Sequence, residues 1–112
     1  MLHYMKLWND SFQAIKDGSK TIEMRLNDEK RSIITCDDII VFKNVKTNEE
    51  IKCLVINIYK YENFIELYKN HDKLSIGYKE NEDADPKDML SYYTIENITK
   101  YGVLGIEVKV VE

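Results

Sequence analysis

The feature that most constrains the fold is the alternation of apolar and polar residues over several short runs. In "TIEMRL", Ile22, Met24 and Leu26 fall on one face, and the polar residues between them fall on the other. The run "VLGIEVKVV" near the C-terminus repeats the pattern. Because successive side chains of a β-strand point to opposite faces, this period of two predicts strands that turn one face toward a core.

Three further runs, "MLHYMKL", "DIIVFKNV" and "IKCLVINIYKY", are also typical of strands, and the polar turn "KTNEE" between the last two predicts a hairpin. Helical spacing appears in "WNDSFQAIKDG", "NFIELYKN" and "DPKDMLSYY", and "TIENITKYG" is a short turn or helix. About five strands and three or four short helices, without regular βαβ alternation, predict an α+β fold whose strands curl into a small barrel.

The helix boundaries carry their own signals. Asp10 and Gln13 have the spacing of a capping box, and Gly18 stands where a left-handed residue ends a helix. Asn63 has the same N-terminal spacing to a glutamate three residues later. Asp85, followed by proline, predicts the start of a helix that buries three later residues, Met89, Leu90 and Tyr93.

Length and composition limit the class of protein. A chain of 112 residues fits one domain spanning 1–112, and 44% hydrophobic with 32% charged residues is ordinary for a soluble globular protein. No apolar run approaches the roughly 20 residues that span a bilayer, so no membrane contact is expected. The N-terminus lacks the features of a secretory signal, which predicts a cytoplasmic protein. Cys36 and Cys53 are then expected to be buried free thiols.

Charge and residue spacing exclude several kinds of site. A net charge of −4 argues against binding duplex DNA through bulk electrostatics, although a local site for nucleic acid stays open. His3 and His71 have no ligand-like neighbours, so we expect no metal. The chain has neither a glycine-rich phosphate loop nor a nucleophile elbow, and no cofactor is expected.

The stretch "GSKTIEMR" resembles the G-x-K-x-x-E-x-R motif of the ASCH domain family, which belongs to the PUA-like superfold. Other segments agree in order: "DEKR" after the motif, "DDIIVF" as the next strand, "GYKENEDADPKDMLSYY", which is similar to a segment of small bacterial members, and "YGVLGIEV" as the closing strand. The likeness runs from about residue 3 to 110 and implies a barrel of about five or six strands flanked by three or four helices.

By this resemblance, the motif lines a cleft that holds single-stranded RNA or a modified base. Lys20 is suited to a phosphate or carbonyl oxygen, Arg25 to a phosphate or a base edge, and Glu23 to an exocyclic amine. Thr21 lies within the motif, and Tyr92 is a candidate for stacking on a base. The expected partner is RNA or a nucleotide-like small molecule.

Simpler interpretations stand beside these. Glu23 and Arg25 can form an exposed ion pair on one strand face, and Trp8 and Tyr93 have the helical spacing of core residues as well as the chemistry of a cleft lining. If the motif is a site, Lys20 must converge with Glu23 and Arg25 on one concave surface beside a tyrosine. Simple alternation along the strand would place residue 20 on the face opposite to Glu23. The turn before the strand must therefore release residue 20 from that alternation.

Two further functions remain open at this point. Some ASCH proteins are hydrolases of acylated cytidine that use a lysine and a threonine three residues later. Lys20 matches that lysine, but Glu23 replaces the threonine. The alternative function is therefore a small amidohydrolase of a modified pyrimidine nucleoside, with Lys20 and Glu23 as catalytic residues. Residues 80–88, with five carboxylates and one lysine, predict a solvated loop and suggest a protein partner as a third possibility.

Overall fold

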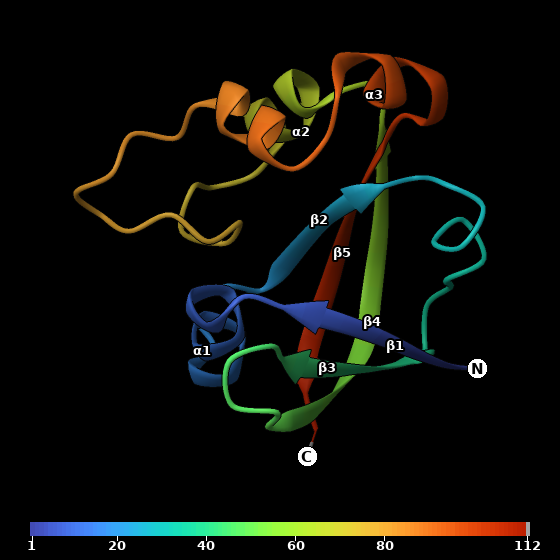
Figure 1. The fold of residues 1–112 in the computed structure, drawn as a ribbon, viewed down its shortest axis with the longest axis vertical. Coiled ribbons are helices and arrows are strands. Elements are labelled where there is room, and N and C mark those ends of the chain that lie inside the picture. The colour runs from blue at the N-terminus through green and yellow to red at the C-terminus, as the bar shows by residue number, and fades with distance from the viewer. Residues whose placement is uncertain (112) are drawn as a thin grey trace.

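The computed structural model describes residues 1–111, in which five strands and four helical segments follow one another (Figure 1). In chain order they are β1 (Leu2–Leu7), α1 (Asn9–Asp17), β2 (Ile22–Leu26), β3 (Ile39–Asn44), β4 (Glu50–Tyr61), α2 (Phe64–Asn70), the 3₁₀ helix η1 (Pro86–Ser91), α3 (Ile95–Tyr101) and β5 (Val103–Val110). The predicted α+β class, the five strands and the β3–β4 hairpin are confirmed.

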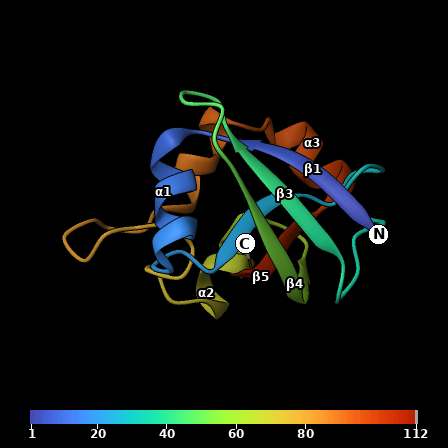
Figure 2. The same ribbon diagram turned by 90° about the horizontal axis from the view of Figure 1, so that it is seen from below.

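All five strands form one curled sheet in the order β1-β3-β4-β5-β2. The β1–β3 pair is parallel and the other three pairs are antiparallel. Strands β1 and β2 are the two edges, and they do not pair, so the barrel is incompletely closed. Helix α1 joins the end of β1 to the start of β2, which brings these edges toward one another beside α1 (Figures 1 and 2).

The sheet buries apolar residues on both faces, which gives two cores. The first contains Phe12 and Ile15 of α1 together with Phe42 and other strand residues. The second lies beneath α2, η1 and α3, which gather at one end of the molecule in Figure 1. Strand β5 serves both cores: Leu104 belongs to the first and Val103 to the second. Residues on both faces of β5 are therefore buried, whereas the alternating pattern predicted a strand with one buried face.

Helix α1 ends as predicted but begins differently. Gly18 has φ 89° and its N–H donates to the carbonyl of Ile15, so it is the left-handed cap that the sequence predicts. The predicted capping box is wrong, because Trp8 is the N-cap residue without a side-chain cap bond and Asp10 lies in the first turn. Gln13 instead donates to Asn9.

The later helices begin where the sequence predicts. The side chain of Asn63 accepts from the Glu66 N–H at the start of α2, and Asp85 accepts from the Lys87 N–H at the start of η1. Met89 is buried in the second core, but the expected burial of Leu90 is wrong, since its side chain is 45% exposed. A 3₁₀ turn has three residues per turn, so neighbouring positions of η1 cannot all face inward.

Both cysteines are free, as expected. Cys53 is buried, and burial raises the pKa of its thiol to about 11. The predicted burial of Cys36 is wrong, because this residue is exposed in the connection between β2 and β3. Along residues 1–111, no helix has the length and apolar character needed to cross a membrane.

Candidate functional site

Three charged side chains of the motif form one buried ion network. Lys20 Nζ lies 2.8 Å from Glu23 Oε1, and Arg25 Nε lies 2.7 Å from Glu23 Oε2. Lys20 is 6% exposed and Glu23 is 4% exposed. The simpler interpretation of an exposed Glu23–Arg25 ion pair is therefore wrong, and the predicted convergence of Lys20, Glu23 and Arg25 is confirmed.

The turn after α1 brings Lys20 to this network. Gly18 reverses the chain in the left-handed region, and the Lys20 N–H donates to the carbonyl of Ala14 before β2 begins at Ile22. Residue 20 thus lies outside the pleat of the strand, and its side chain can reach the face occupied by Glu23. Lys20 Nζ also lies 3.3 Å from Ser11 Oγ of α1.

Gly77 covers the aliphatic part of Lys20 from the other side. A Cβ at residue 77 would lie 3.1 Å from Lys20 Cδ and 3.7 Å from Nζ, and Gly77 has φ +111°. The position therefore requires glycine both for its backbone conformation and for the close approach. The lysine is held between α1 and the chain that follows α2.

Glu23 is the charge centre of the network. Burial alone would raise the pKa of this carboxyl, but the positive charges and hydrogen bonds of Lys20 and Arg25 outweigh burial and lower it. Each carboxylate oxygen already accepts from one cation. Glu23 is thus ionised and holds the two cations in place, which leaves little of its capacity for an exocyclic amine.

Arg25 also bridges the open seam of the barrel. Its Nη2 donates to the main-chain carbonyl of Lys6 at 2.9 Å, which links edge strand β2 to edge strand β1. A guanidinium carries five N–H donors. Two of Arg25's donors are used, by Glu23 and by Lys6, so three have no hydrogen-bond partner among residues 1–111.

A cavity of about 550 Å³ opens over this seam. The ion network contributes Lys20, Glu23 and Arg25 to its lining. The end of β1 contributes Lys6 and Leu7, and the exposed N-cap residue of α1, Trp8, follows them. The volume falls within the roughly 300–1,000 Å³ that is typical of small-molecule sites. Charged lining residues balance, with four cations against four carboxylates, namely Lys6, Lys20, Arg25 and Lys79 against Asp10, Glu23, Glu82 and Asp88.

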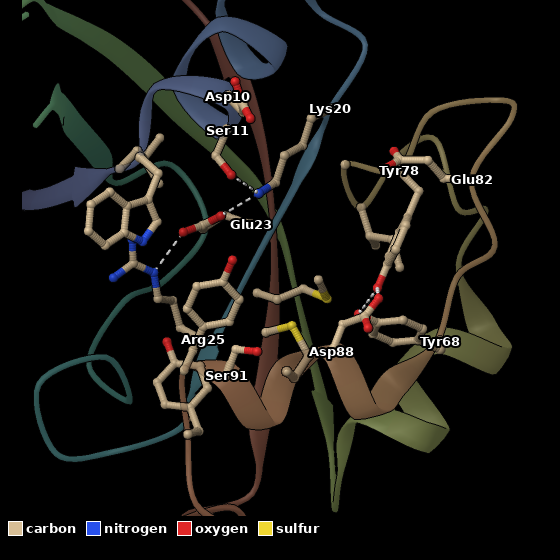
Figure 3. A pocket seen from close by; sticks show the side chains of 18 of the residues that line it. Asp10, Ser11, Lys20, Glu23, Arg25, Tyr68, Tyr78, Glu82, Asp88 and Ser91 are labelled. Carbon is tan, nitrogen blue, oxygen red and sulfur yellow. Dashed lines mark hydrogen bonds and ion pairs between the residues drawn. The ribbon is translucent and has the colours of Figure 1, made fainter. Parts of the chain in front are cut away.

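The chain from α2 to η1 forms the facing wall. Tyr78 donates to Asp88 Oδ2 at 2.7 Å, and its hydroxyl lies 2.9 Å from that of Tyr68. Burial, followed by the hydrogen bonds to Tyr68 and Asp88, raises the pKa of Tyr78 well above its usual value. Figure 3 shows these three side chains across the cavity from Lys20 and Glu23.

The remaining predicted site residues differ in whether they line the cavity. Tyr92 lines the cavity and is 61% exposed, whereas Thr21 is not part of the lining and uses its backbone to bond Ser75 and Val108. Tyr93 is half-buried, packs against the second core and also lines the cavity. The core interpretation of Trp8 is wrong, since this side chain is 66% exposed at the rim.

Sequence reasoning missed Ser11, Gly77, Tyr78 and Asp88 as cavity residues. Ser11 lies in the first turn of α1, and the glycine-aromatic pair at 77–78 was a detectable signal for a tight approach. Nothing in the local pattern indicates that residue 77 lies against residue 20.

The acidic segment 80–88 is partly tied to the protein. Lys73 Nζ donates to the carbonyls of Glu80 and Glu82, and Glu82 Oε1 accepts from the Lys79 N–H. Within the described chain, no group of three or more metal-ligating side chains forms. This segment therefore contributes a wall to the cavity.

Comparisons with known proteins agree with this geometry. The model of the ASCH domain family matches residues 5–112. The crystal structure of hypothetical protein PH0355 is similar, with 30% identity, a TM-score of 0.84, and coverage of 99% of this chain and 100% of that one. The solution structure of protein PF0455 from Pyrococcus furiosus has 30% identity and a TM-score of 0.77, covering 100% and 99%.

A more distant structure shares the fold alone. It is a mutant of ZmASCH from Zymomonas mobilis, with 13% identity and a TM-score of 0.68, covering 97% of this chain and 70% of that one. None of the curated proteins matches the chain. The fold is thus α+β and PUA-like, and the match over nearly the whole chain shows that this protein belongs to the ASCH domain family.

Proposed function

We propose that this ASCH domain binds a short single-stranded RNA or a nucleotide-like molecule in the cavity over the β1–β2 seam. The observation that carries the proposal is the buried Lys20–Glu23–Arg25 network with unused donors facing an open cavity. The roles of these residues as ligand contacts, and of Tyr92 as a stacking surface, belong to this proposal.

Hydrogen-bonding capacity supports a ligand at this wall. Lys20 has three N–H donors, of which Glu23 and Ser11 accept two, and Arg25 has three more without partners among residues 1–111. No nitrogen of Lys20 or Arg25 is both buried and without a partner among the described residues, so the unused donors are accessible from the cavity. Base carbonyls, ring nitrogens and phosphate oxygens all supply acceptors, and Arg25 presents a planar fork to them.

Two exposed aromatic side chains supply the other component of nucleotide recognition. Trp8 and Tyr92 line the same cavity, and each is more than half exposed. Stacking of a base on an aromatic ring contributes about 1–3 kcal/mol in proteins that bind single strands. Because these rings are exposed at the cavity rim, they can stack on a base without first leaving contacts in the core.

The electrostatics favour binding over hydrolysis. An acid or base role for Glu23 requires proton exchange near neutral pH, but its pKa is lowered and both of its oxygens accept from cations. Lys20 is an ion-pair partner within 2.8 Å of that carboxylate, which is unsuited to an activating amine. The amidohydrolase alternative therefore gains no support from this geometry.

The test is titration of short fluorescent oligonucleotides and mononucleotides into the protein and into two tyrosine variants. Tyr92→Ala should weaken binding by about 1–3 kcal/mol through lost stacking. Tyr4→Ala is the matched control, because Tyr4 is 62% exposed on β1 and does not line the cavity. Its affinity should equal that of the unmodified protein.

Salt dependence provides a second readout. The cavity charges balance, and only Lys20 and Arg25 present unused donors in the ion network, so the affinity should fall weakly with salt. Absence of binding at low salt would refute the proposed function. Equal loss in Tyr92→Ala and Tyr4→Ala would place any binding outside this cavity.

A further inference from the structure

Asp88 differs from Glu23, the carboxylate at the centre of the ion network. Glu23 has both oxygens occupied by cations, whereas Asp88 has one oxygen, Oδ2, bound to the Tyr78 hydroxyl. Its Oδ1 has no hydrogen-bond partner in the part of the chain that the structure describes. Of the four carboxylates that line the cavity, Glu23 thus holds its neighbours, whereas the exposed Asp88 keeps one free acceptor while a tyrosine holds its other oxygen.

A relay of hydroxyl groups orients Asp88. Tyr78 has one hydroxyl proton and two acceptors within reach, Asp88 Oδ2 at 2.7 Å and the Asp85 carbonyl at 3.2 Å, and donation to the nearer one leaves its oxygen to accept from Tyr68 at 2.9 Å. The Tyr68 and Tyr78 rings also meet edge to face, with centroids 5.8 Å apart. The pKa of Tyr78 is raised, so its hydroxyl remains a donor across the physiological pH range. The relay therefore fixes which oxygen of Asp88 remains available.

The ion network and Asp88 consequently have opposite hydrogen-bonding character, although Asp10 and Lys79 add a charge of the other sign to each wall. Lys20 and Arg25 present unused donors from the barrel, and Asp88 presents an unused acceptor from η1 (Figure 3). A ligand that contacts both the ion network and Asp88 offers acceptors to the first and a donor to the second. A purely anionic group satisfies the first wall but meets a carboxylate at the second.

We propose that Asp88, positioned by Tyr78, is a specificity-determining residue that selects ligands with an exocyclic amine over analogues with a carbonyl at the same place. This inference rests on the proposed function and adds the class of base that the cavity accepts. Cytosine and adenine present such an amine beside ring acceptors, whereas uracil and hypoxanthine present an oxygen there. An oxygen opposite Asp88 Oδ1 would place two acceptors in contact.

The experiment compares dissociation constants for two pairs of ligands, CMP with UMP and AMP with IMP. Within each pair the sugar, the phosphate and the ring size are equal, so the ratio reports the exocyclic group together with the adjacent ring nitrogen, which is an acceptor beside the amine and an N–H donor beside the carbonyl. A hydrogen bond to a charged group corresponds to about tenfold or more in affinity. The unmodified protein should therefore prefer the amine member of whichever pair it binds by about tenfold.

Two acid-to-amide variants separate Asp88 from its surroundings. Asp88→Asn supplies a donor as well as an acceptor and should bring the ratio near one. Glu82→Gln is the matched control: Glu82 lines the same wall and also has one free oxygen, but it is held by the Lys79 N–H of its own loop and not by the tyrosine pair. Glu82→Gln should keep the ratio of the unmodified protein.

Two tyrosine variants test the positioning role. Tyr78→Phe removes the hydroxyl that holds Asp88 and should lower the ratio by about threefold, a fraction of the effect of a full charged hydrogen bond. Tyr68→Phe leaves the Tyr78–Asp88 contact intact and should preserve the ratio. General damage to the fold would weaken both members of a pair alike and leave the ratio unchanged.

The outcomes are distinct. Binding of nucleotides without a preference for the amine, or with a preference that survives in Asp88→Asn, overturns the role of Asp88 and leaves the proposed function standing. Absence of binding by all four nucleotides refutes the proposed function and this inference with it. A ratio that collapses in Asp88→Asn but not in Glu82→Gln establishes the inference.

Discussion

Two buried carboxylates occupy different ends of this barrel and have different surroundings. Glu23 accepts from Lys20 and Arg25 at the β1–β2 seam. Asp38, just before β3, accepts from His3 Nε2 at 2.8 Å, from the Thr35 N–H at 3.0 Å and from the N-terminal ammonium at 3.0 Å. Both residues are less than a tenth exposed.

The pKa of each carboxyl is lowered, but for different reasons. For Asp38 the hydrogen bond to His3 is the largest cause, followed by the Thr35 N–H and the N-terminus. For Glu23 the neighbouring positive charges and hydrogen bonds overcome a large opposing effect of burial. A lowered pKa in a buried carboxyl therefore does not by itself mark a site.

The two networks differ in whether their side chains have unused hydrogen-bond donors beside an open cavity. The partners of Asp38 fasten the first strand to the turn before β3, and Asp38 does not line the cavity. The partners of Glu23 retain donors and line a cavity. The number of unused hydrogen-bond donors thus distinguishes the ion network that only stabilises the fold from the one suited to a ligand.

The largest expected effect comes from Glu23→Gln. Removal of the charge leaves the buried Lys20 and the partly buried Arg25 without their common counterion, and breaking a buried ion pair costs about 3–5 kcal/mol. The free energy of unfolding in urea should fall by that amount, and nucleotide affinity should fall with it. Glu49→Gln is the control, because Glu49 pairs with Lys16 at an exposed site and should cost about 0–1 kcal/mol. Equal losses in both variants would contradict a special role for burial.

Lowering the pH should weaken both networks, that of Glu23 first and that of Asp38 at lower pH. Each carboxyl has a lower pKa when folded than its ordinary value, 4.5 for Glu23 and 3.8 for Asp38, so the unfolded chain takes up protons first. The stabilisation is complete above these values and is lost as the pH falls through the folded pKa. Urea midpoints should therefore drop below about pH 4.5.

Variants assign the acid-induced loss to each carboxyl. Glu23→Gln should lose the part that begins near pH 4.5, and Asp38→Asn the part that begins at lower pH. Urea unfolding at a series of pH values measures both. An unchanged pH profile in Glu23→Gln would show that Glu23 does not supply the predicted linkage.

The sequence predicted the elements of this site better than their surroundings. Period-two runs indicated the strands, and the glycine at 18 indicated the turn that releases Lys20 from the pleat. Local pattern also placed Glu23 and Arg25 on one face. It suggested an exposed pair, however, because burial of that face depends on α1 and on the chain around Gly77, far from the motif in sequence.

The errors share this cause. Trp8 follows helical spacing with Phe12 and Ile15, but it is the N-cap residue of α1 and extends from the helix at the cavity rim. Asp88 is exposed, as the solvated-loop prediction requires, but the pattern did not indicate its bond to the Tyr78 hydroxyl ten residues away. Spacing reports on neighbours along an element, and contacts between loops are not encoded in that periodicity.

The smallest expected effect separates two glycines with positive φ. Gly77→Ala and Gly18→Ala should each lower the free energy of unfolding by about 1–2 kcal/mol, the cost of placing a side chain in the left-handed region. Only residue 77 meets a neighbour, since an added Cβ lies 3.1 Å from Lys20 Cδ, whereas nothing lies within 4 Å of one at residue 18.

Nucleotide affinity is therefore expected to fall in Gly77→Ala and to stay constant in Gly18→Ala at equal stability. The reason lies in the contrast between the two carboxylates. Asp38 accepts from a backbone N–H and from groups of the first strand, but Glu23 depends on a flexible lysine stem that another segment must hold. Titration and urea unfolding of both variants measure this. Unchanged affinity in Gly77→Ala would mean that Ser11 and Glu23 alone fix the ammonium of Lys20.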